Sequence, residues 1–309
     1  MKRLGLWGDM PVRRAAAYYV IAFSLALGIA LFGQSMGEGA ALLTMFTPLA
    51  AVLVMKLVVT RDGYSLSSWK ELCIHRPGVR FWPLALVLPA LALLPGYALL
   101  WGSDVARLTS EPWAADLRTV IKFVIGIFIA AVLGGIGEEI GWRGYLLPHL
   151  MKLGQLRASI ATGFLHGVWH LPLLLLTPFY HQDGNRWIVV ALFLVALTAA
   201  GPVYGWFRIA SGSIWPAAIL HAALNDWWDL FDKAAVTDSR VVVEYVAGES
   251  GVVAIAMYVI LAVLVWRSTL YRGSGKAPGG NDLNAALPPS KSSARHSFRK
   301  ACHPVRTPL

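Results

Sequence analysis

Long apolar stretches recur along almost the whole chain, and they constrain its fold more than any other feature. A helix needs about 20 mostly apolar residues to cross the hydrocarbon core of a bilayer. Segments close to this length occur eight times in the 309 residues, at 15–32, 40–59, 81–101, 120–139, 158–176, 187–207, 214–231 and 252–266. We therefore predict an all-α fold, a polytopic membrane helix bundle of about eight transmembrane helices.

The composition agrees with this prediction. Hydrophobic residues make up 57% of the chain and charged residues 14%, whereas a soluble domain has roughly a half and a quarter. The fourth, fifth and seventh segments contain ionisable groups, but each still carries long apolar runs. Two cysteines are too few for a Cys-rich zinc or iron–sulfur site.

The distribution of charge orients the spans, because basic residues mark the cytoplasmic side of a membrane. Basic residues precede the first span and fill alternate loops, among which we place Arg143 and Arg208. The opposite loops are acidic, and the last of them carries Asp232, Asp238, Glu244 and Glu249. Eight spans with both termini in the cytoplasm satisfy this alternation. We predict a multi-pass protein of the plasma (inner) membrane.

The ends of the chain differ from the bundle. We expect residues 1–14 to be a cytoplasmic segment, 15–272 the bundle, and 273–309 a disordered basic cytoplasmic tail. More than half of the net charge of +10 lies in residues 271–309, which hold seven basic residues and one acidic residue. The charge therefore does not indicate nucleic-acid binding. Such a tail is attracted to anionic lipid, and a solvated tail with no specific partner is the alternative.

Ionisable side chains at membrane depth are costly, so they are candidates for function. Glu138, Glu139 and Arg143 form the first cluster. On a helix, Glu139 and Arg143 are four residues apart with the acid first, which favours an ion pair. Glu138 then points about 100° away, which leaves it available as a working acid. The alternative is a helix end whose acids reach water.

Two further clusters lie in later spans. His166 and His170 share one helix face, and His221 and Asn225 lie one turn apart on another. A carboxylate, imidazoles and an amide together can activate water and stabilise an oxyanion. Packing histidines and an asparagine that joins helices are the structural alternatives. The residues indicate an intramembrane hydrolase, with a proton-coupled transporter as the rival, although the internal repeats typical of transporters are not evident.

The three clusters resemble the motifs of the CPBP family, the CAAX-processing and bacteriocin-processing (Abi) intramembrane proteases. Its Glu-Glu-x-x-x-Arg motif is met by Glu138, Glu139 and Arg143, and its His-x-x-x-Asn motif by His221 and Asn225. Its third motif is an aromatic residue four positions before a histidine. His170 fits the histidine, but His166 stands where the family has Phe or Trp. The resemblance covers about 132–225, inside a predicted protease core at about 120–232.

The resemblance implies an intramembrane endopeptidase, similar to CAAX prenyl protease 2-like domains, that cleaves membrane-associated or lipidated peptides or proteins. It implies that Glu138 is the general base, helped by His170, and that His221 and Asn225 hold the oxyanion. Glu139 and Arg143 then brace the first motif, and His166 is a supporting residue.

This mechanism needs no metal. A zinc-dependent version is an alternative, with Glu138, His170 and His221 as a two-histidine, one-carboxylate ligand set. A non-proteolytic membrane scaffold is another alternative.

Overall fold

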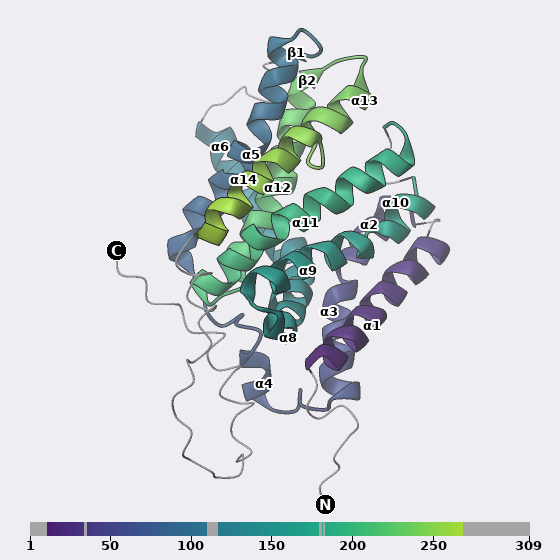
Figure 1. Cartoon of the computed structure of the whole chain (residues 1–309), viewed down its shortest axis with the longest axis vertical. Helices are drawn as coiled ribbons and strands as arrows, with labels where there is room; N and C mark the ends of the chain where they lie inside the picture. Colours follow the sequence, from purple (N-terminus) through teal and green to yellow (C-terminus); the bar gives the residue numbers. More distant parts are fainter. Residues whose placement is uncertain (1–10, 34–35, 110–116, 179–180, 182, 268–309) are drawn as a thin grey trace, which may run out of the picture.

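A computed structural model describes residues 11–33, 36–109, 117–178, 181 and 183–267 (Figure 1). Within these residues the chain is almost wholly helical, which confirms the all-α prediction. Most of the predicted cytoplasmic N-terminal segment and the predicted basic tail lie outside the described residues.

Fourteen α-helices lie within the described residues. They are α1 (Pro11–Phe32), α2 (Glu38–Met45), α3 (Thr47–Val54), α4 (Leu66–Lys70), α5 (Trp82–Gly102), α6 (Leu117–Ala130), α7 (Ile136–Glu139), α8 (Leu147–Leu150), α9 (Gln155–Trp169), α10 (Leu171–Leu176), α11 (Arg186–Ser211), α12 (Trp215–Ala234), α13 (Arg240–Val242) and α14 (Val252–Arg267). Two short strands, β1 (Arg107–Leu108) and β2 (Ala235–Val236), pair antiparallel with Arg107 opposite Val236. This pair joins the end of α5 to the end of α12.

Seven helical stretches in the described part of the chain are long and apolar enough to cross a membrane. They are Pro11–Phe32, Gly39–Val59, Val79–Gly102, Arg118–Leu153, Gln155–Leu176, Arg186–Ser211 and Arg240–Arg267. Each overlaps one of the eight predicted spans, so the chain is a multi-pass membrane protein. The remaining predicted span, 214–231, is helix α12, whose second half carries Asp226, Asp229 and Asp232. The count of eight and the cytoplasmic position of both termini stay predictions.

The fourth span is much longer than predicted. It was expected to end at Glu139, with Arg143 in a cytoplasmic loop, but the helical stretch continues to Leu153. Arg143 does not end the helix because it pairs with Glu139 one turn earlier, and it is only 2% exposed. Arg208 was also expected in a loop. It is buried within α11, where its Nε donates to the carbonyl oxygen of Arg143 at 3.1 Å.

The core of the described residues contains two large apolar clusters and a small third one on α10 and α11. The first large cluster gathers side chains of α5, α11, α12 and α14, and the second gathers side chains of α1, α3, residues 140–150 and α9. Helices α9 and α11 cross the centre of the view between α1 and α14 (Figure 1). These two helices approach closely, because a Cβ atom on Gly163 would lie 2.3 Å from the carbonyl oxygen of Leu197. Small residues at such crossings are typical of membrane bundles.

Candidate active site

The two glutamates of the first motif lie in an irregular part of the fourth helical stretch. Helix α7, which carries Glu138 and Glu139, is flanked by wider π-helical segments at Ala131–Gly135 and Ile140–Leu146. Each π-helical turn holds an extra residue and therefore rotates the side chains that follow it; such turns are frequent at functional sites. Both glutamates point into the bundle, with exposures of 2% and 0%.

Glu139 is the centre of a buried ion-pair network. Its Oε1 atom accepts from Arg143 at 2.8 Å, as the spacing predicted, and lies 3.0 Å from Nδ1 of His221 on α12. Because an ionised carboxylate only accepts hydrogen bonds, Nδ1 of His221 is the donor. The Arg143 guanidinium also stacks over the Tyr204 ring, 4.3 Å from its centroid. Glu139 is therefore neutralised and holds α12 against the fourth helical stretch.

Glu138 faces the two histidines near the end of α9. Its Oε2 atom lies 2.8 Å from Nε2 of His166, and the His166 ring packs on Trp142 with centroids 4.9 Å apart. The Nδ1 atom of His170 lies 3.1 Å from the carbonyl oxygen of His166. A carbonyl oxygen only accepts, so Nδ1 of His170 carries a proton, and the lone pair of the neutral ring is at Nε2. The histidine that contacts Glu138 is thus His166, whereas the sequence favoured His170.

A small cavity of about 50 Å³ lies among these groups. Its polar lining residues are Arg143, His166, His170, Tyr204, His221, Asn225, Glu249 and Tyr258. Every site residue predicted from the sequence either lines this cavity or, like Glu138 and Glu139, is bonded to a histidine that does. Because about 10–15 Å³ of such space is enough for one water molecule, the cavity has room for water beside these side chains.

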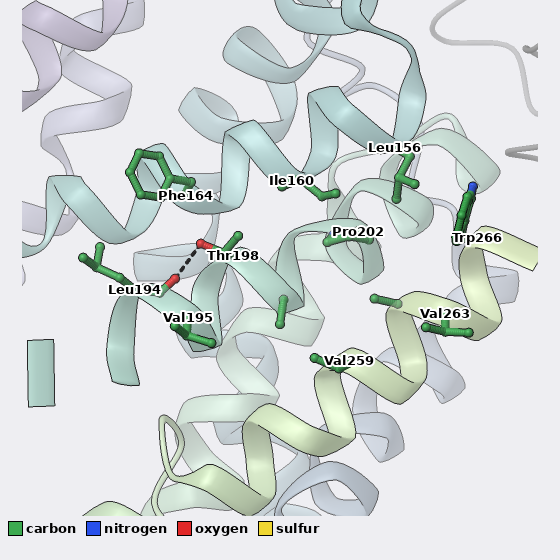
Figure 2. Close-up of a pocket in the computed structure, with 12 residues that line it drawn as sticks. Leu156, Ile160, Phe164, Leu194, Val195, Thr198, Pro202, Val259, Val263 and Trp266 are labelled. Atoms are coloured by element: carbon green, nitrogen blue, oxygen red, sulfur yellow. Dashed lines mark hydrogen bonds between the residues drawn. The ribbon is translucent and has the colours of Figure 1, made fainter. Parts of the chain in front are cut away.

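A larger hollow elsewhere is not a site of chemistry. It measures about 560 Å³ and is formed by α9, α11 and α14. Figure 2 shows its apolar lining, from Leu156 and Ile160 to Val259 and Trp266. The Thr198 hydroxyl in it already donates to the carbonyl oxygen of Leu194, at 2.5 Å. Since none of its lining residues is ionisable, we place the candidate active site at the smaller, polar cavity.

Three donor atoms of the site are spaced for a metal ion. One atom each of Glu138, His166 and His170 lie within 4.8 Å of one another. A catalytic zinc often uses two histidines and one carboxylate, with ligand atoms roughly 3.3 Å apart if bonds are about 2 Å. The Nδ1–H contact of His170 with a backbone carbonyl is also a usual support for a ligand histidine. The residues therefore fit zinc with small movements, although the set has His166 where the predicted set had His221.

Sequence reasoning missed Tyr204, Glu249 and Tyr258 on the cavity wall, and also the partners of Glu249. Glu244 and Glu249 were expected as solvated charges of an outer loop, but they are 8% and 7% exposed. Both contact the buried ring of His181, and Glu249 lines the cavity. The loop prediction is wrong for Glu244, which lies in a π-helical segment, whereas Glu249 does lie in a turn, with its side chain buried. Their spacing from His181, 63 and 68 residues, follows no helical or strand period that could have revealed the contacts.

Fold and site together define a class: a polytopic membrane protein with a buried carboxylate–imidazole site of the kind that activates water. Residues 120–227 match the family model described as Type II CAAX prenyl endopeptidase Rce1-like. A protein of Methanococcus maripaludis named CAAX prenyl protease 2 is 30% identical over 105 residues, which are 33% of this chain and 39% of that relative. All three motifs lie within the matched residues. The central part of this chain is therefore similar to this family of proteases, in agreement with the resemblance of its motifs, and the chain spans less than half the length of the relative.

Proposed function

We propose that this protein is an intramembrane endopeptidase that hydrolyses peptide bonds of membrane-associated or lipidated peptides or proteins. The observation that carries the proposal is the arrangement of Glu138. Its buried carboxylate is bonded to an imidazole beside a cavity that suits a water molecule. The family match and the relative's name support the same class of reaction.

In this proposal Glu138 is the general base that takes a proton from the attacking water. The lone pair at Nε2 of His170 assists, and His166 orients the Glu138 carboxylate through its Nε2–H. His221 and Asn225 on the cavity wall supply the donors that stabilise the tetrahedral oxyanion. Glu139 fixes the ring of His221 through Nδ1, and Arg143 balances the charge of Glu139. The reaction needs no resident metal.

A zinc-dependent version of the same protease is the second candidate. The three donor atoms of Glu138, His166 and His170 favour it. Zinc bound there would supply Lewis-acid activation of water, and these three side chains would hold it.

The test is cleavage of prenylated and unprenylated peptides by protein purified in detergent, with and without a chelator. We expect cleavage that survives chelation and is lost in Glu138→Gln, which keeps the shape of the side chain and removes the base. Glu71→Gln, which changes an exposed carboxylate, is the matched control and keeps full activity. Loss on chelation that zinc restores would establish the zinc version. Unchanged cleavage by Glu138→Gln would reject the assignment of the site.

We place the protein in the plasma (inner) membrane, with its substrate entering from the bilayer. The predicted basic tail would add attraction to anionic lipid. Flotation of the full chain with vesicles that contain or lack anionic lipid does not test this, because the bundle inserts in both. A peptide of residues 273–309 tests it directly, and we expect it to bind only the anionic vesicles.

A further inference from the structure

A second buried group of ionisable side chains adjoins the cavity and belongs to none of the three motifs. Its centre is His181, between α10 and α11. The Nδ1 atom of His181 lies 2.5 Å from Oε1 of Glu244, and its Nε2 lies 3.0 Å from Oε1 of Glu249. We call these three residues the His181 clamp. Since both ring nitrogens face carboxylates, which only accept, both carry protons and the ring is an imidazolium.

The surroundings of His181 hold its ring in one place. The ring stacks on Trp228 of α12, with centroids 5.2 Å apart and an angle of 17°, and meets Phe193 of α11 edge-on at 5.4 Å. Burial lowers the pKa of His181, but the hydrogen bonds to Glu244 and Glu249 outweigh it and raise the pKa to about 9. The ring is therefore charged at neutral pH. A cation against an indole face is itself stabilised.

The backbone that carries Glu249 is also fixed. Residues 248–251 form a tight turn closed by the hydrogen bond from the Gly251 amide to the Gly248 carbonyl oxygen, 2.8 Å long. A Cβ atom on Gly251 would lie 2.6 Å from the backbone of Val246, so this position requires glycine. The Tyr258 hydroxyl reaches the carbonyl oxygen of Glu249 at 3.4 Å. The turn and the clamp together hold the Glu249 carboxylate at the cavity wall.

A peptide substrate carries N–H groups that such a carboxylate can bind. Arg143, His221 and Asn225 offer hydrogen-bond donors to the cavity, which suit the oxygens of a substrate. A peptide also brings N–H groups out of water, and each one left unpaired in a buried site is costly. In the proposed reaction Glu138 already serves as the general base. Glu249 is the carboxylate among the residues that line the cavity.

We propose that Glu249 is a substrate-contacting residue that accepts hydrogen bonds from the N–H groups of the peptide in the cavity, and that His181 positions it. The inference rests on the proposed function, because it takes a peptide as the occupant. It extends that function to a residue outside the family motifs.

Glu244 provides a matched control within the clamp. Both acids are buried, and both contact the ring of His181, but only Glu249 is among the residues that line the cavity. Replacing either acid disturbs His181 in the same way. A difference between the two replacements therefore reports the contact with the substrate.

The experiment measures binding of a fluorescein-labelled prenylated peptide to full-length protein in detergent micelles, by anisotropy. All variants also carry Glu138→Gln, so that the peptide is not consumed. We expect Glu249→Leu to raise Kd by about tenfold or more, as loss of a hydrogen bond to a charged group does. We expect Glu249→Gln, which keeps an acceptor, to have a smaller effect of the same sign. Glu244→Leu and Glu244→Gln should each raise Kd by less than the matching Glu249 variant, because they loosen His181 but keep the Glu249 acceptor, and thermal unfolding checks that each variant is folded.

A second measurement distinguishes a direct contact between Glu249 and the peptide from a structural effect of replacing Glu249. Ester-for-amide replacements in the peptide remove one N–H at a time. A replacement that weakens binding to the parent should have no effect on Glu249→Leu, since its acceptor is already gone. Equal effects of the Glu244 and Glu249 variants, or an ester effect that persists in Glu249→Leu, would overturn the inference.

Hydrolysis by the protein without the Glu138 change is recorded in parallel and tests the proposed function. Glu249-dependent binding without hydrolysis would reject the protease and retain Glu249 as a peptide contact. Hydrolysis together with binding that is independent of Glu249 would support the protease and reject Glu249 as a peptide contact. No binding of the prenylated peptide by the parent would reject both.

Discussion

Two buried glutamate–histidine groups lie beside the same cavity, and they are built differently. The motif residues lie on long helical stretches, and the two glutamates have different surroundings. Glu139 is paired with Arg143, whereas Glu138 faces two imidazoles. The His181 clamp joins a connection between helices to a π-helical segment and a turn. Both ring nitrogens of His181 are bonded to carboxylates. The difference indicates that the first group can move a proton, whereas His181 can only hold its partners in place.

The largest effect should separate Glu138, which is bonded to a histidine of the cavity, from Glu249, which lines the cavity. Glu138→Gln removes the general base, so we expect kcat to fall between about a hundredfold and ten-thousandfold. Glu249→Gln weakens substrate binding, so we expect a higher KM with a much smaller change in kcat. Steady-state cleavage of the prenylated peptide gives both constants. A loss in kcat of the same size for both variants would remove the distinction between the two groups.

The next effect concerns stability within the motif cluster. Glu139→Ala leaves Arg143 buried without its carboxylate, and the loss of one member of a buried pair costs about 3–5 kcal/mol of unfolding free energy. Glu138→Ala should lower the unfolding free energy by less, because it leaves no permanent charge without a partner. Unfolding in mixed micelles measures both variants. Adding Arg143→Met to Glu139→Ala should recover part of the loss, and no recovery would contradict this account of the pair.

The clamp should make stability depend on pH in a defined direction. The pKa of His181 is about 9 in the folded protein and about 6.5 in an unfolded chain. Its contribution is therefore complete below about pH 6.5 and is lost as pH rises through 9, amounting to roughly 3 kcal/mol. Thermal unfolding from pH 6 to 10 should show this loss in the wild-type protein. His181→Asn, which does not titrate, should lack it; the same slope in both would exclude the clamp as its source.

The helices and the motif pairing could be predicted from the sequence because both depend on local spacing. Apolar length located the spans, and the four-residue spacing predicted the pair of Glu139 with Arg143. The end of the fourth span was misplaced for a physical reason. Arg143 counts as a loop charge in any hydropathy argument, yet a partner one turn away and a tyrosine ring let it stay buried.

The clamp could not be predicted, because it depends on tertiary packing. Glu244 and Glu249 have the composition of an exposed acidic loop, and only the fold brings His181 between them. The histidine that is bonded to Glu138 could not be predicted from the sequence either. His166 and His170 share a helix face, and the π-helical segments around Glu138 decide which of the two rings its carboxylate meets.

The smallest effect should decide between those two histidines. His166→Phe restores the aromatic residue that the family motif carries and keeps the packing on Trp142, but it removes one hydrogen bond to Glu138. We expect a loss in kcat/KM of about tenfold, with a larger loss for His170→Phe, because His170 supplies the lone pair at Nε2. Peptide cleavage measures both variants, and zinc content of the purified proteins is measured beside it. A near-complete loss in His166→Phe together with loss of bound zinc would instead make His166 a metal ligand, since a positioning hydrogen bond to Glu138 does not account for metal content.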